Sequence, residues 1–233
     1  MCLKMLITCD VRGLEVVTAA WLSKDQTLRQ EILDGVDIHS VNQEAFKFPS
    51  RLVAKRFKFK MIYGGTAGGF TIDPDLKITG FSKDEWEKVI TEYYSKYHGI
   101  AEWHQELIKQ VLETGFLEIP SGRRFDYRKL LESPDWYYLP KIKNYPVQGF
   151  GADIVKIARI SLFRRWKPEF GKLVNTIHDS IVLDIPQKEW YNISIVVKEV
   201  FKDLPTNLSN MYQIRWDLPI EVEFKQLNGE EVQ

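Results

Sequence analysis

Cysteine is scarce in this sequence, and long hydrophobic runs are absent from it. Only Cys2 and Cys9 occur among the 233 residues, and both lie near the amino terminus, which excludes a disulfide framework and a cysteine-based metal cluster. No apolar run approaches the length of a membrane-spanning helix, and the first ten residues are too short and too soon charged for a signal peptide. The sequence therefore predicts a globular, intracellular protein without a membrane segment.

An excess of charge of either sign is also lacking, since 32 Lys and Arg residues balance 32 Asp and Glu residues. This balance gives no global electrostatic signal for a nucleic-acid-binding protein. Acidic residues are missing from the segment between Phe46 and Ile72, which carries six basic ones: Lys47, Arg51, Lys55, Arg56, Lys58 and Lys60. The segment is therefore a local positive field in a neutral protein.

Within this field, Arg51, Lys55, Phe59 and Tyr63 follow one another at four-residue intervals. On an α-helix each such step turns by only about 40°, so the four side chains share one face over roughly 18 Å. Two cations suit phosphates and two rings suit a flat base, so the face fits a nucleoside triphosphate. The alternative is an ordinary basic amphipathic helix with a solvated or membrane-surface face.

The rest of the chain is expected to combine short strands with longer helices. Strands are predicted for residues 3–9, for hairpins within 116–127 and 173–186, and for 218–224. Helices are predicted for residues 14–33, from 37 onward, 51–63, 82–97, 100–113, 145–166 and 190–204. The glycine-rich segment 64–81 is expected to be a mobile connector and a hinge instead of a packed element.

Six segments of the chain resemble the family A DNA polymerases, the family of bacterial DNA polymerase I and several phage replicases. The pattern R-x-x-x-K-x-x-x-F-x-x-x-Y-G from Arg51 to Gly64 matches that family's fingers helix, and DVRGLE, with Asp10 and Glu15, resembles its first catalytic motif. Further similarity lies in NYPVQG at 144–149, IHDS at 177–180, DIH at 37–39 and SGRR at 121–124. The resemblance implies a template-directed DNA polymerase that transfers nucleotides from dNTPs to a primer 3′-hydroxyl.

The resemblance also implies the roles of the catalytic residues. Asp10 and Asp179 would be the catalytic carboxylates that hold two Mg²⁺ ions, with Mn²⁺ as the alternative metal. Arg51 and Lys55 would bind the dNTP triphosphate, and Lys55 would also protonate the leaving group. These four residues would form the reacting centre.

Recognition of the base, the sugar and the DNA falls to a second set of residues. Phe59 would pack on the incoming base or sugar, while Tyr63 would lie near the nascent base pair and bond Glu15, which blocks a ribose 2′-hydroxyl. The primer-template DNA would be contacted by five residues: Arg123, Arg124, Asn144, Gln148 and His178. The histidines His39, His98 and His104 show no mutual ligand spacing and are interpreted as structural.

Three positions depart from the family pattern. Ser180 stands where the third motif usually has a second carboxylate, and His-Asp-Ser also occurs in phage-type single-subunit RNA polymerases. An RNA polymerase fragment is therefore an alternative, although Glu15 and Phe59 favour deoxynucleotides. Val17 and Pro140 occupy two positions where basic residues are expected, and the nearby Arg12 or Lys141 is the candidate substitute.

The expected fold is α+β, with an antiparallel polymerase palm sheet and an inserted, mainly helical fingers module. Residues 1–22 and 140–233 are assigned to the palm and residues 23–139 to the fingers, with the thumb and exonuclease domains absent. A phage-like, truncated or split polymerase is expected, in the host cytoplasm if a phage encodes it, with a separate upstream chain carrying the thumb. The contrasting hypothesis is a noncatalytic DNA-binding or assembly subunit.

Overall fold

A computed structural model describes residues 3–132 and 139–227, so Cys2 lies outside the described part of the chain. The chain divides into two compact units. Residues 1–14 and 149–233 form the sheet unit, and residues 15–148 form the helical unit. The mixed α+β composition with antiparallel strands confirms the predicted fold class. Among the described helices, none is both long and apolar enough to cross a membrane.

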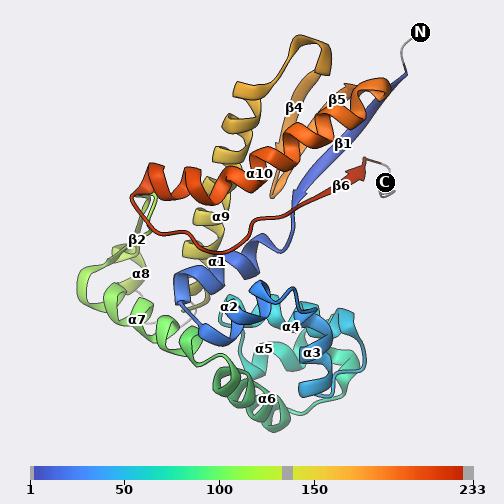
Figure 1. The fold of residues 1–233 in the computed structure, drawn as a ribbon. Helices are drawn as coiled ribbons and strands as arrows, with labels where there is room; N and C mark the ends of the chain where they lie inside the picture. The colour runs from blue at the N-terminus through green and yellow to red at the C-terminus, as the bar shows by residue number, and fades with distance from the viewer. Residues whose placement is uncertain (1–2, 133–138, 228–233) are drawn as a thin grey trace. The chain divides into compact units, whose positions relative to one another are not determined.

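A four-stranded antiparallel sheet forms the centre of the sheet unit (Figure 1). Its strands lie in the order β4 (Lys172–Ile177), β5 (Ser180–Pro186), β1 (Lys4–Val11) and β6 (Val222–Gln226). The first strand, β1, therefore lies between two strands from the end of the chain. In this register Asp10 stands opposite both Ser180 on β5 and Glu223 on β6.

One face of this sheet is apolar because side chains alternate along each strand. Cys9 stands opposite Ile181 and Phe224, and all three side chains therefore point to one face. The Phe224 ring packs against Trp190 at the start of α10 (Trp190–Tyr212), with ring centroids 5.0 Å apart. The alternate positions, which include Asp10 and Ser180, point to the other face, so the register itself determines where the polar groups gather.

Helices make up most of the helical unit. They are α2 (Gln26–Leu33), α3 (Ile38–Ala45), α4 (Arg51–Ile62), α5 (Ala67–Ile72), η1 (Lys77–Thr79), α6 (Lys83–Lys96), α7 (His98–Thr114) and α8 (Arg128–Leu131). A hairpin of β2 (Phe116–Glu118) and β3 (Arg124–Asp126) follows α7. Two further helices, α1 (Leu14–Ser23) and α9 (Leu139–Arg165), contain residues of both units, and η3 (Pro168–Phe170) and η4 (Gln187–Glu189) belong to the sheet unit.

The core of the helical unit is a cluster of aromatic rings around Phe57 of α4. Phe57 is fully buried, and its ring lies 5.0 Å from Phe48 and 5.7 Å from Trp86, to which it is nearly parallel. Such ring pairs contribute beyond their buried area, each by about 0.5–1.5 kcal/mol. The cluster holds one face of α4 against the core and leaves the opposite face, with Arg51 and Lys55, exposed.

The helix predicted for residues 14–33 is in fact two helices. The backbone turns at Lys24, which has a φ of 54°, and the buried Asp25 then caps α2 by accepting a hydrogen bond from Leu28 N at 2.8 Å. The second carboxylate oxygen of Asp25 accepts from Ile100 N at 3.3 Å, at the start of α7. This contact between residues distant in sequence accounts for the break.

The glycine-rich segment after Tyr63 is also more ordered than the sequence predicts. It contains α5, whose Phe70 is buried in the aromatic core, so the expectation of a segment without packed elements is wrong. Two ion pairs join the residues after α5 to α4: Arg56 with Asp75 at 2.6 Å, and Lys60 with Asp73 at 2.5 Å.

Three other predicted boundaries shift. The helix α9 begins at Leu139 and includes Pro146, α10 extends to Tyr212, and β6 begins at Val222. The residues before β6 are instead fixed by the buried Trp216, whose indole N–H donates to Leu218 O at 2.7 Å. Other local signals are confirmed, including the Ser50 cap of α4 and the Ser82 and Glu85 capping box of α6.

Candidate functional site

Asp10 and Asp179 lie at the same end of neighbouring strands in the sheet unit. Asp10 is near the end of β1, and Asp179 belongs to the two-residue turn between β4 and β5. The other turn residue, His178, has a φ of 52°, as tight hairpin turns require. Val11 N donates to Asp179 O at 3.1 Å, which ties the turn to β1. The structure thus places Asp10 and Asp179, which are far apart in sequence, on adjacent backbone segments.

The Asp10 carboxylate has two partners within the chain. Ser180 Oγ donates a hydrogen bond to Oδ1, and Lys225 Nζ lies 3.0 Å from Oδ2. The hydrogen bond with Asp10 raises the pKa of Lys225 above its ordinary value, so the ammonium stays charged. Ser180, which replaces the usual family carboxylate, therefore contributes a hydroxyl donor to Asp10.

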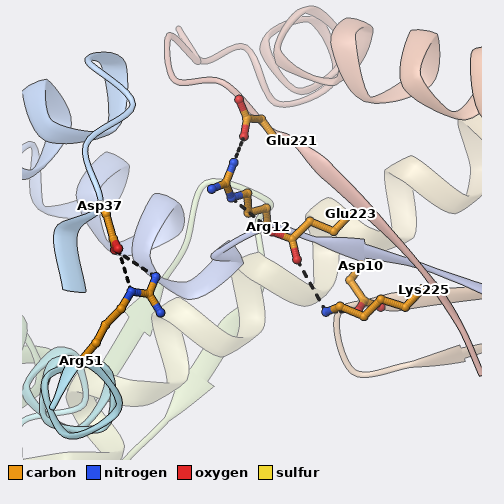
Figure 2. Close-up of polar contacts among 7 residues, drawn as sticks. All are labelled: Asp10, Arg12, Asp37, Arg51, Glu221, Glu223 and Lys225. Atoms are coloured by element: carbon orange, nitrogen blue, oxygen red, sulfur yellow. Dashed lines mark hydrogen bonds and ion pairs between the residues drawn. The ribbon is translucent and has the colours of Figure 1, made fainter. Parts of the chain in front are cut away.

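Asp10 is the first member of a row of ion-paired side chains whose charges alternate in sign (Figure 2). Lys225 Nζ is also 3.5 Å from Glu223 Oε2, and the other oxygen of Glu223 is 3.2 Å from Arg12 Nε. Arg12 in turn pairs with Glu221 at 3.0 Å. We call this row from Glu221 to Asp10 the charge ladder.

Oxygen atoms dominate the donor chemistry around Asp10. Two carboxylates and the Ser180 hydroxyl are ligands that suit hard cations such as Mg²⁺ or Mn²⁺. Within the described residues, no group of three or more His, Cys, Asp or Glu side chains is arranged to hold a metal ion. The donor types fit the predicted metal, while Lys225 already occupies one oxygen of Asp10.

In the helical unit, the residues of the predicted nucleotide-binding face lie on α4 or at its end, as the four-residue spacing predicts. Arg51 and Lys55 are exposed, and Phe59 and Tyr63 are half-buried. Lys55 Nζ lies 6.0 Å from the centre of the Phe59 ring, and the centroid of the His39 ring lies 6.1 Å from that of Phe59. The face therefore combines a cationic end with an aromatic end, as the spacing predicts.

Arg51 is already paired with a carboxylate of the chain. Its guanidinium donates two hydrogen bonds to Asp37, from Nε to Oδ2 at 2.7 Å and from Nη2 to Oδ1 at 2.9 Å (Figure 2). These bonds hold the pKa of Asp37 well below its usual range. Asp37 also caps α3 by accepting from the backbone N–H groups of His39 and Ser40. The Asp37 carboxylate thus both binds Arg51 and caps α3.

Tyr63 lies at the carboxyl end of α4 beside α9. Its hydroxyl accepts a short hydrogen bond from Gln148 Nε2, so two predicted site residues meet within the helical unit. Gly64 has a φ of 76°, which favours glycine, and a Cβ there would require the flexible Lys143 side chain to move, since its Cδ would lie 2.3 Å away. The predicted bond between Tyr63 and Glu15, which is half-buried on α1, stays a prediction.

His104 supports the same end of α4 from within the core. Its Nε2 lies 3.0 Å from Ile62 O and its Nδ1 lies 3.2 Å from Tyr94 Oη. Because a carbonyl only accepts, Nε2 carries the proton, and Nδ1 accepts from the tyrosine. Burial lowers the pKa of His104 to about 3, which keeps the ring neutral. This geometry agrees with a structural histidine.

The predicted DNA contacts lie on several elements. Arg124 is exposed on β3, 3.7 Å from Glu118, with its guanidinium over the Phe116 ring, and the neighbouring Arg123 is exposed too. A second set comprises Asn144 and Gln148 of α9 and the exposed His178 of the sheet unit. The Asn144 Oδ1 atom is buried and accepts no hydrogen bond from the described residues. Their contact with DNA stays a prediction.

Sequence reasoning did not identify Lys225 as a neighbour of Asp10, nor Asp37 as a partner of Arg51. A signal for the first was present: Glu221, Glu223 and Lys225 alternate with Val222 and Phe224, and alternate residues of a strand share a face. The predicted strand ends at Phe224, whereas β6 continues to Gln226 and therefore includes Lys225. No comparable local signal existed for Asp37 and Arg51, which belong to separate helices.

Comparisons with known proteins show which proteins this chain resembles. The 29% identical thermostable DNA polymerase I of Thermus filiformis and the 28% identical DNA polymerase I of Treponema pallidum each match 94% of this chain. The chain spans only 26% and 22% of the length of these relatives. In fold it resembles a solved POL domain of Pol1 from M. smegmatis, described as a complex with DNA primer-template and dNTP, with a TM-score of 0.78 and 23% identity over 97% of this chain and 40% of that one. Since residues 3–228 match the family described as DNA polymerase family A, the chain belongs to that family.

Proposed function

We propose that this chain is the catalytic part of a template-directed DNA polymerase, which joins a nucleotide from a dNTP to a primer 3′-hydroxyl. The observation that carries the proposal is the meeting of Asp10 and Asp179 at one end of the antiparallel sheet, in a chain of family A. In this proposal the sheet unit corresponds to the palm and the helical unit to the fingers.

Asp10 and Asp179 would hold two Mg²⁺ ions, with Mn²⁺ as the alternative. When bound, such ions activate the attacking hydroxyl and stabilise the charge of the leaving pyrophosphate. The carboxylates supply the negative charge that holds hard cations, and Ser180 orients Asp10 through its hydrogen bond to Oδ1. The chain would thereby contribute oxygen ligands from strand β1 and from the turn between β4 and β5.

Arg51 and Lys55 would bind the triphosphate of the incoming dNTP. A guanidinium binds phosphate oxygens through two parallel hydrogen bonds, as it now binds the two oxygens of Asp37. Lys55 would add a point charge and donate a proton to the leaving pyrophosphate. Phe59 and Tyr63, farther along α4, would pack near the base and sugar.

Sugar selection would fall to Glu15, and DNA contact to the basic and amide residues. Glu15 would block a ribose 2′-hydroxyl from a position beside Tyr63. The primer-template DNA would be contacted by Arg123, Arg124, Asn144, Gln148 and His178, of which Arg123, Arg124, Gln148 and His178 are exposed. These exposed side chains support contact with a large polyanion.

Primer extension with Mg²⁺ and dNTPs tests the proposal, with the chain alone and with a separate thumb-bearing polypeptide. We expect Asp10→Asn and Asp179→Asn each to lower extension by about a thousandfold or more, because each removes an anionic metal ligand. Asp184→Asn is the matched control, since Asp184 lies on β5 and pairs instead with Lys4. Extension by both site variants at the wild-type rate would refute the proposal.

A phage-type RNA polymerase remains the competing function because the motif reads His-Asp-Ser, with Ser180 bonded to Asp10. Competition between dNTPs and rNTPs separates the two functions. We expect dNTPs to be preferred, and Glu15→Ala to raise the relative use of rNTPs by about tenfold, since removing one steric and polar discriminator has an effect of this order. A preference for rNTPs in the wild-type chain would favour the RNA polymerase.

A further inference from the structure

We propose that Lys225 is a built-in competitor for divalent cations at Asp10. Its ammonium lies 3.0 Å from Asp10 Oδ2, on an oxygen that a metal ion would use. The proposal rests on the assignment of Asp10 as a metal ligand in the proposed function. It adds a residue that tunes the affinity of the site for metal.

The sheet register positions this ammonium. Glu223 stands directly opposite Asp10, and Lys225 is two residues farther along β6, so all three side chains emerge on the same face. Both Lys225 and Asp10 lie on hydrogen-bonded strands, which limits the freedom of their backbones. The contact is therefore a consequence of strand pairing and not of a flexible terminal segment.

Occupation by the ammonium makes metal binding an exchange. The ion pair must open before a cation can bind Oδ2. The apparent affinity of the site for the cation therefore equals the intrinsic affinity multiplied by the fraction of molecules in which Oδ2 is free. A divalent ion carries twice the charge of an ammonium and can prevail once its concentration is sufficient. The ion pair consequently raises the concentration of divalent cation that is needed to occupy the site.

The charge ladder gives the displaced ammonium a second partner. Lys225 Nζ is already 3.5 Å from Glu223 Oε2, and Arg12 holds the other oxygen of Glu223 at 3.2 Å. A small movement of the flexible lysine stem toward Glu223 would release Asp10 without leaving the ammonium unpaired. The ladder thus makes the exchange reversible.

Direct measurement of Mn²⁺ binding by electron paramagnetic resonance, on the whole chain without DNA or dNTP, tests the proposal. We expect Lys225→Met to bind Mn²⁺ about threefold to tenfold more tightly than wild type, the size of effect expected from removing a partly exposed ion pair. Lys225→Arg keeps the cation and should remain close to wild type. Asp10→Asn should remove the gain when combined with Lys225→Met.

Lys4→Met is the matched control because Lys4 pairs with Asp184 at 3.2 Å at the other end of β1. It should leave Mn²⁺ affinity unchanged. An affinity of Lys225→Met equal to or weaker than that of wild type, or a gain that persists with Asp10→Asn, would overturn the proposal. If primer extension fails but Lys225→Met still strengthens Asp10-dependent Mn²⁺ binding, only the polymerase function is refuted.

Discussion

Each unit contains one charged residue that is predicted to bind a ligand and that already forms an ion pair with another residue of the chain. In the helical unit, the predicted phosphate ligand Arg51 is paired with Asp37; in the sheet unit, the predicted metal ligand Asp10 is paired with Lys225. The side chains of the first pair are 54% and 46% exposed, whereas Lys225 and Asp10 are 39% and 20% exposed. Solvent therefore screens the first pair more strongly.

The two pairs also differ in geometry and in what else their members do. Arg51 and Asp37 form a bidentate bond, and the carboxylate additionally caps α3, so it cannot move without cost to that helix. Lys225 is a point charge on a flexible stem, with Glu223 as a second partner nearby. The difference suggests that a ligand of Arg51 must pull the arginine away, whereas a ligand of Asp10 displaces the lysine.

Within the first pair, the larger effect is expected from removing the cation. Arg51→Ala should lower kcat/KM for dNTP incorporation by about a hundredfold or more, since a bidentate charged contact to phosphate is lost. Steady-state primer extension measures this effect. Lys109→Ala, at an exposed position on α7, is the control and should remain within twofold of wild type. An equal loss of kcat/KM in both variants would contradict the assignment of Arg51 as a ligand of the dNTP triphosphate.

A third cation, Lys58, extends the comparison to a lysine without a hydrogen-bond partner. It is fully buried on the core side of α4, and its Nζ lies 4.9 Å from the centre of the Tyr97 ring with no hydrogen bond in the described structure. Burial lowers the pKa of Lys58 to about 7. We expect Lys58→Met to raise the free energy of unfolding at pH 7 by about 1–4 kcal/mol, because an apolar side chain avoids the cost of burying the charge.

The pH dependence of this effect has a definite sign. Between about pH 7 and the ordinary lysine value of 10.5, the unfolded chain binds the proton that the folded chain releases, so stability rises with pH. Below pH 7 both states are charged and the full penalty remains. Urea unfolding at several pH values should show that Lys58→Met flattens this rise, while Lys55→Met on the exposed face leaves it unchanged.

The smallest effect is expected from neutralising Asp37. Asp37→Asn keeps an amide oxygen that can cap α3 but removes the charge that competes with phosphate for Arg51. The KM for dNTP should fall by about twofold to fivefold with kcat unchanged. Ser40→Ala removes another partner of Asp37, at 2.7 Å, and controls for the cap. A rise in KM would instead make Asp37 a positioning residue for Arg51.

Local signals in the sequence predicted much of the architecture. The Ser50 cap, the capping box at Ser82 and the hairpin around His178 each depend on neighbours within a few residues, and all three are present. The face of α4 also follows from spacing alone. Family resemblance supplied the pairing of Asp10 with Asp179, which no local pattern specifies.

Contacts between distant residues account for what the sequence did not predict. Asp25 ends α1 and begins α2 because it also binds Ile100 N, and the glycine-rich segment forms α5 because Phe70 enters the aromatic core. The roles of Lys225 and Asp37 likewise depend on partners in other elements. The assigned actions on nucleotide and DNA stay predictions that the variants above address.

Gly64 has a consequence for altering this protein by mutagenesis. Its φ of 76° is a backbone conformation that other residues rarely adopt, so a side chain at this position would strain the turn that ends α4 beside Tyr63. Gly68 of α5 differs, since nothing lies within 4 Å of a Cβ there and its backbone does not require glycine. A library that varies residue 68 and keeps residue 64 fixed would change α5 while preserving the backbone conformation that ends α4 at Tyr63.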